Sequence, residues 1–273
     1  TFSMTPLREI FGFSSRLLLT NLFVQLQDNV TASIMGTSFT KHDVGQYTQS
    51  AKWSTMGGNL VVSTVAGVAQ PAMTAARQSE GDSAQLELLR AMLRATAWLA
   101  FPAMASLALV AQPFIVITVG EKWLPCVPLL QVLCIWAALK PLSHLFAQVA
   151  VSRGRSSLYL YITVAAAVLQ IAVLLTVRQW GVMAMAIGFV SVGSLFTLLW
   201  LLVARRLAGL RLRHAALDTG RFAFAAAIAM GTAWWFTKGI PPLWPLLLAR
   251  TAIGGTLYLA LTHRQLLKWK RKM

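Results

Sequence analysis

Long apolar runs are the feature that most constrains the fold of this chain. Residues 158–177, for example, contain no charged side chain. A helix needs about 20 mostly apolar residues to cross the hydrocarbon core of a bilayer, and runs of that kind recur along the sequence. The sequence therefore predicts an all-α, polytopic membrane protein.

The composition supports lipid rather than water as the surrounding solvent. Of the 273 residues, 57% are hydrophobic and 12% are charged, whereas soluble domains are about 45–50% apolar and about 25% charged. In a soluble protein, a net charge of +16 would suggest a nucleic-acid partner. Here the basic residues fall in short clusters between apolar runs, so we expect no nucleic-acid partner.

Reading the sequence with a membrane-spanning window predicts eight transmembrane helices. The predicted spans are 17–38, 54–76, 95–118, 127–150, 158–177, 181–203, 222–238 and 242–263. The first two are the weakest, because they are rich in Asn, Gln, Ser, Thr and Gly.

The positive charges between these spans predict an orientation. Apart from Lys140 and Arg250, which lie inside spans, seventeen Lys and Arg residues fall at one set of ends and five at the other. Lys and Arg are concentrated in cytoplasmic loops. We therefore expect both ends of the chain to be cytoplasmic.

The longest gap on the basic side, 77–94, allows two interpretations. Leu86, Leu89 and Leu93 form the stripe of an amphipathic helix on the membrane surface, or the segment is a solvated loop that becomes the next span. The sequence holds no nucleotide-binding loop, metal-ligand cluster or nucleophile elbow, so we expect no cofactor, no metal and no catalytic residue. Cys126 and Cys134 are interpreted as core thiols.

Span 127–150 carries a polar stripe in its interior. Lys140, His144 and Gln148 recur every four residues and so share one side of a helix. A charge at the bilayer centre costs about 2.5–3.5 kcal/mol on insertion scales, and such residues usually face a bundle interior or a wet cavity. The stripe is a candidate substrate-contacting surface, and the alternative is that Lys140 pairs with a buried carboxylate for packing alone.

Span 17–38 carries a second polar face. Asn21, Gln25 and Asp28 follow one another at helical spacing, and Asn29 lies beside Asp28. Asp28 is the only acidic residue deep inside a predicted span. It is a candidate partner of Lys140 or a group that binds a coupling proton or cation, and structural pairing is the alternative.

Arg250 is a third charge inside a predicted span. It lies about nine residues from the outer end of span 242–263, within one span's length of the interface. It either contacts an anionic substrate, extends outward to the interface or binds a backbone carbonyl.

Several stretches of the sequence resemble a known family. The most specific is "GEKWLPCVPLLQVL" at 120–133, and it is accompanied by "VSRGRSSLYL" at 151–160, "LREIFGFSSRLLLTNL" at 7–22, "HDVGQYTQSAKW" at 42–53 and "QPAMTAARQSEGDSAQL" at 70–86. The resemblance spans the whole chain and is loose in the last two predicted helices. The chain resembles bacterial polysaccharide exporters, the flippases of lipid-linked oligosaccharides. They belong to the superfamily of multidrug, oligosaccharidyl-lipid and polysaccharide exporters.

The resemblance implies a fold of up to fourteen helices in two lobes around a central cavity. Residues 1–273 would form the second lobe of this MATE-like (multidrug and toxin extrusion) fold, helices seven to fourteen, and the N-terminal lobe would be missing. Spans 17–38 and 54–76 would then line the cavity. Lys140 departs from the apolar residue expected beside Pro141 in such a protein.

The resemblance also implies a function without catalysis, in the bacterial inner membrane. The chain would translocate an undecaprenyl-diphosphate-linked oligosaccharide by alternating access, for O-antigen, capsule or exopolysaccharide export. Its partners would be that lipid-linked oligosaccharide, membrane lipids and the missing lobe of the same protein. Its substrate-binding residues would be Asn21, Gln25, Asp28, Asn29, Lys140, His144, Gln148 and Arg250.

Two other functions stay open at this point. One is cation-coupled multidrug efflux within the same superfamily, with Asp28 as the coupling carboxylate. The other is a membrane glycosyltransferase or polymerase that uses the same lipid-linked substrate, although the predicted outer loops are short for an active site.

Overall fold

A computed structural model describes residues 5–239 and 243–270, and within these ranges the chain is helical apart from short turns. The helices are α1 (Thr5–Ser38), α2 (Lys41–Leu109), α3 (Ala111–Thr118), α4 (Cys126–Ser152), α5 (Ser156–Val177), α6 (Val182–Ala208), α7 (Leu212–Phe236) and α8 (Trp244–Lys270), with the 3-10 turns η1 (Glu121–Trp123) and η2 (Arg178–Trp180). The all-α prediction is confirmed.

Five helical segments in the described ranges are long and apolar enough to cross a membrane. They are Gly81–Leu109, Cys126–Ser152, Ser156–Trp180, Val182–Ala208 and Trp244–His263. The last four match predicted spans closely, and the first shares only residues 95–109 with the predicted span 95–118. The remaining predicted spans, 17–38, 54–76 and 222–238, lie on α1, α2 and α7 but do not meet the same criteria. The chain is a multi-pass membrane protein, and the count of eight spans stays a prediction.

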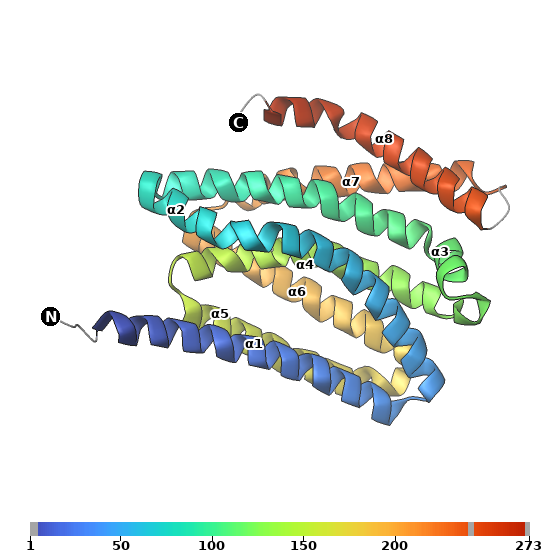
Figure 1. Ribbon diagram of the computed structural model, residues 1–273, viewed down its shortest axis with the longest axis horizontal. Helices are drawn as coiled ribbons and strands as arrows, with labels where there is room; N and C mark the ends of the chain where they lie inside the picture. The colour runs from blue at the N-terminus through green and yellow to red at the C-terminus, as the bar shows by residue number, and fades with distance from the viewer. Residues whose placement is uncertain (1–4, 240–242, 271–273) are drawn as a thin grey trace.

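α2 reverses direction at Gly81, so it forms two antiparallel arms (Figure 1). Gly81 has φ 83° and ψ −166°, a conformation that glycine adopts without the steric cost of a Cβ atom. Leu89 and Leu93 on the second arm are fully buried in the core. The prediction of a membrane-surface helix at 77–94 is therefore wrong, because its leucine stripe packs inside the bundle.

The predicted span 95–118 is interrupted at Val110, where α2 ends and α3 begins one residue later. The physical reason is Pro113, which has no backbone N–H to donate to the carbonyl of Leu109 four residues earlier. The apolar pattern continues across the break, so hydropathy alone did not reveal it.

The helices are arranged around α4 (Figure 1). α1 and α5 lie together on one side of the bundle, and α7 and α8 lie on the opposite side, with α2 and α6 between them. The start of α1 and the end of α8 lie at the same end of the bundle, and the α1–α2 turn and α3 lie at the other. Of the most apolar stretch of α4, 56% is buried inside the bundle, against 22% for the corresponding stretch of the segment that contains α5. α4 is therefore the more central of these two helices.

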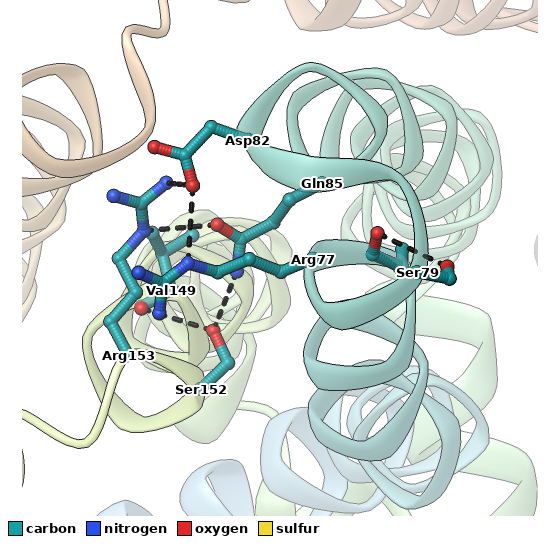
Figure 2. A network of polar contacts seen from close by, with 8 residues as sticks. Arg77, Ser79, Asp82, Gln85, Val149, Ser152 and Arg153 are labelled. Atoms are coloured by element: carbon teal, nitrogen blue, oxygen red, sulfur yellow. Dashed lines mark hydrogen bonds and ion pairs between the residues drawn. The ribbon is translucent and has the colours of Figure 1, made fainter.

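Polar networks hold the end of the bundle where the chain begins (Figure 2). Asp82, next to the reversal, accepts from Arg77 at 3.1 Å and pairs with Arg153 of α4 at 2.9 Å. Gln85 accepts from Arg153 Nε at 2.9 Å and donates to Ser152 Oγ at 2.9 Å. These contacts fix the α2 reversal to the end of α4.

The buried carboxylate of Asp218 ties α7 to α2 near the same end. Asp218 is 4% exposed, and its oxygens lie 2.8 Å from Arg90 Nε, 3.7 Å from Arg94 Nε and 3.4 Å from Arg221 Nη2. A buried carboxylate needs such partners, because desolvating an unpaired charge is costly.

The start of α2, at the opposite end, is capped by its own sequence. Thr40 accepts a hydrogen bond from the Asp43 backbone N–H at 3.2 Å, and its hydroxyl donates to Asp43 Oδ2 at 2.7 Å. This hydroxyl contact lowers the pKa of the Asp43 carboxyl below its ordinary value. A carboxylate in the first turn also interacts favourably with the helix dipole.

Candidate functional site

Two cavities meet at the middle of α4. The first, which we call the α2 cavity, has a volume of about 340 Å³ and lies among α1, α2, α4 and α6. Its polar wall includes Thr31, Tyr47, Thr48, Ser54 and Thr55. Hydroxyl groups of this kind both donate and accept hydrogen bonds, so this wall offers polar partners to a ligand, while the rest of the lining is mostly apolar.

The second cavity, which we call the α5 cavity, has a volume of about 220 Å³ and lies among α1, α4, α5 and α6. Its wall combines polar side chains, among them Gln27, Ser143 and His144, with aromatic ones. It extends toward the end of the bundle where the chain begins, whereas the α2 cavity extends toward the α1–α2 turn.

Lys140, Trp136 and Phe189 line both cavities. The Trp136 and Phe189 rings meet edge to face, with centroids 6.5 Å apart and an interplanar angle of 84°. Gly193 of α6 makes room for the indole, because a Cβ atom there would lie 2.6 Å from Trp136 Cε3. These side chains form the boundary between the cavities, and Lys140 is one of the three residues that make it.

Lys140 is held by a residue of α2 that sequence reasoning missed. Its Nζ donates to Asn59 Oδ1 at 3.2 Å. Pro141 deprives the Ala137 carbonyl of its helical donor, and Gly58 approaches that carbonyl so closely that a Cβ atom would lie 3.2 Å from its oxygen. Asn59 lies next to Gly58, where α2 packs against the Pro141 turn of α4, and this close approach is seen only in the structure.

The other two residues of the predicted α4 stripe have different positions: His144 lines a cavity, and Gln148 contacts His144 from behind. His144 lines the α5 cavity. Gln148 is buried, lines neither cavity, and has its Nε2 atom 3.0 Å from His144 Nε2. The two ring nitrogens of histidine are distinguished by such partners, so Gln148 orients the imidazole.

Three residues of the predicted polar face of α1, Asn21, Gln25 and Asn29, line neither cavity. Asn21, Gln25 and Asn29 are exposed on the helix surface, and the α1 residues that line the cavities include Val24, Gln27 and Thr31 instead. The cavity-lining face is thus the neighbouring face of the same helix. The side chain of Asp28 lies outside the described part of the chain.

Arg250 lies away from both cavities, where it joins α8 to other helices. Its Nη1 donates to the Leu109 carbonyl at 2.8 Å and its Nε donates to Thr237 Oγ1 at 3.2 Å. The Leu109 carbonyl is the one that lacks a backbone donor within the helix, because Pro113 has no N–H. The backbone-carbonyl contact, which the sequence analysis named as an alternative, is therefore present, and a substrate role for Arg250 stays a prediction.

Other residues of chemical interest have ordinary surroundings. Cys126 and Cys134 are free and buried, as expected for core thiols. Among the described residues, no group of three or more His, Cys, Asp and Glu side chains is arranged to hold a metal ion.

Comparison with known proteins shows what the sequence is similar to. Residues 1–128 match the profile of the family described as polysaccharide biosynthesis protein. This part of the chain is similar to that family. The predicted resemblance to membrane proteins of polysaccharide biosynthesis is thereby confirmed, and the matched residues include all of α1, α2 and α3.

Two relatives support the same family. The chain is 25% identical, over 203 residues, to an "Uncharacterized membrane protein in cps region" of Klebsiella pneumoniae; the match covers 73% of this chain and 41% of that protein. It is 28% identical, over 160 residues, to "Teichuronic acid biosynthesis protein TuaB" of Bacillus subtilis (strain 168), covering 59% of this chain and 33% of that protein. The chain thus matches less than half the length of each relative. No solved structure matches it.

Proposed function

We propose that the chain forms the C-terminal lobe of a flippase for undecaprenyl-diphosphate-linked oligosaccharides. In this proposal residues 1–273 supply helices seven to fourteen of a MATE-like fold, with eight spans, and the N-terminal lobe belongs to the same polypeptide. The family match and the greater length of the relatives support it. The lobe breaks no bond and carries no catalytic residue.

The observation that carries the proposal is that Lys140 lines two adjacent cavities, each of which has polar side chains in its wall. The lipid tail of such a substrate can stay in the bilayer, but its anionic head must cross about 30 Å of hydrocarbon. A cavity lined by hydroxyls, amides and a cation lowers that barrier, because it replaces the lost hydration. A lysine ammonium binds phosphate as a point charge.

The two cavities suggest how the head group advances. In an alternating-access cycle, one lobe rocks against the other around a fixed site. The diphosphate would stay near Lys140 while the route to the α5 cavity closes and the route to the α2 cavity opens. The wall of Trp136 and Phe189 would separate the two routes.

The proposed location is the bacterial inner membrane, with both ends of the chain in the cytoplasm. The excess of Lys and Arg at one set of ends supports this orientation, because basic loops are retained on the cytoplasmic side. The partners would be the lipid-linked oligosaccharide, the surrounding lipids and the N-terminal lobe.

The test is replacement of Lys140 by Met in the full-length protein. We expect polysaccharide export to fall at least several-fold at an unchanged membrane level of the protein, because the site loses its cation. Lys140→Arg should retain more export than Lys140→Met, and Lys52→Met, an exposed lysine of α2, is the matched control. Normal export by Lys140→Met would contradict the proposal, and lost drug resistance instead of export would favour the efflux alternative.

A further inference from the structure

Gln170 is an amide whose burial the described contacts do not explain. It lies on α5, is 3% exposed and lines the α5 cavity. Its Nε2 atom has no hydrogen-bond partner among the described residues. Buried polar atoms in native proteins almost always have a partner, and because Gln170 lines a cavity, a ligand held there can supply the missing acceptor.

The wall around Gln170 narrows the class of ligand. Trp136, Trp200 and Tyr159 line the same cavity, and the Tyr159 and Trp200 rings lie 5.6 Å apart at a tilt of 42°. His144 and Ser143 add hydrogen-bonding groups. A matching ligand has apolar faces for the rings and hydroxyls around its edge, as a sugar ring does.

The volume limits how much of an oligosaccharide the cavity can hold. At about 220 Å³ it is smaller than the 300–1,000 Å³ typical of sites for drug-sized ligands, yet several times the ~30 Å³ share of one water molecule in the liquid. This volume fits one ring rather than a chain of sugars.

We propose that the α5 cavity binds the first sugar of the transported molecule, the one attached to the diphosphate, and that Gln170 donates a hydrogen bond to it. The proposal rests on the proposed function, since Lys140 borders the same cavity and would hold the diphosphate beside that sugar. Gln170 is then a residue that lets the transporter discriminate a sugar-bearing lipid from a bare one.

Two lipid probes separate this subsite from the diphosphate site. The full-length protein in nanodiscs is titrated with undecaprenyl diphosphate and with undecaprenyl-diphosphate-linked N-acetylglucosamine. We expect the wild type to bind the sugar-bearing probe more tightly. Gln170→Met should lower affinity for that probe about tenfold, the effect of about one buried hydrogen bond, and leave the bare probe unchanged.

The control variant is Gln131→Met. Gln131 is an amide of α4 that lines a different cavity and donates to the Ala108 carbonyl at 3.1 Å, so its loss should leave the affinities for both probes unchanged. Lys140→Met should lower the affinity for both probes. If Gln170→Met lowers the affinity for both probes equally, or changes neither affinity, the assignment of a sugar subsite is overturned while the proposed function stands. If the wild type binds neither probe, the proposed function itself fails.

A second measurement is independent of any ligand. Because Gln170 Nε2 lacks a described partner, Gln170→Met should raise the thermal midpoint of the ligand-free protein or leave it unchanged. A marked fall of the midpoint relative to Gln131→Met would mean that the amide supports the fold, and would overturn the assignment to a ligand.

Discussion

At the scale of the residue, the boundary between the cavities depends on the size of single side chains. Gly193 is required not for its backbone freedom but for its lack of a Cβ atom beside the Trp136 indole. Interiors are packed so densely that one added methyl group forces neighbouring side chains to move. The position of the Trp136 ring is therefore set by α6 as much as by α4.

Gly193→Ala should displace the indole and destabilise the protein by about 1–3 kcal/mol, the usual cost of overpacking. Gly188→Ala on the same helix is the matched control. Its Cβ would lie 3.1 Å from its nearest neighbour, Val173 Cγ1, whereas a Cβ at Gly193 would lie 2.6 Å from Trp136 Cε3. Thermal unfolding in detergent compares the two. Equal midpoints would contradict a tight fit at Gly193.

The residue scale also shows what the sequence could and could not predict. The spacing of Lys140 and His144 predicted a shared face, and both line the α5 cavity. Asn59 was missed because its role depends on the close approach of α2 to α4, which no local pattern encodes. The buried carboxylate of Asp218 was missed too, because it lies just outside the predicted span 222–238 and is buried by arginines of a distant helix.

At the scale of the element, prolines decide how α8 attaches to the bundle. Pro102 and Pro113 leave the carbonyls of Trp98 and Leu109 without helical donors. The Tyr258 hydroxyl donates to the Trp98 carbonyl at 2.8 Å, and Arg250 Nη1 donates to the Leu109 carbonyl at 2.8 Å. In lipid, where water cannot satisfy such groups, these two contacts replace the missing backbone bonds.

This arrangement predicts a specific coupling. Tyr258→Phe should destabilise the protein by about 1–3 kcal/mol, the cost of leaving a buried carbonyl unpaired. In a Pro102→Ala background the restored backbone N–H can donate to Trp98, so the same substitution should cost markedly less. A double-mutant cycle measured by thermal unfolding gives the coupling, and strictly additive effects would argue against the replacement.

Hydropathy located five helical segments, four of them closely, because each contains a long apolar stretch. It could not predict the break at Val110 or the burial of Leu89 and Leu93, since both depend on which carbonyls and which neighbouring helices face the segment. Hydropathy is also a weak guide to α1 and α7, which are helical but do not meet the criteria for a membrane span.

At the scale of the whole molecule, the reversal at Gly81 and the up-and-down order of the helices put the start of α1 and the end of α8 at one end (Figure 1). The α1–α2 turn must then lie at the opposite end from the α6–α7 connection. This relation follows from the fold alone, whichever side of the membrane each end faces.

Labelling of single cysteines tests that relation in the full-length protein. In a background with Cys126 and Cys134 replaced by Ala, Lys52→Cys and Arg213→Cys should react with an impermeant thiol reagent from opposite sides. The charge distribution further predicts that Arg213→Cys reacts from the cytoplasm. Reaction of both positions from one side would refute the bundle topology.

The exposed amides of α1 have one last consequence. Asn21, Gln25 and Asn29 point out of the bundle described here, and hydrocarbon offers no hydrogen bonds to an amide. A strip of this kind is stable only where something polar covers it. The strip therefore marks a contact surface, and a crosslinker attached at Gln25 would identify the partner that covers it.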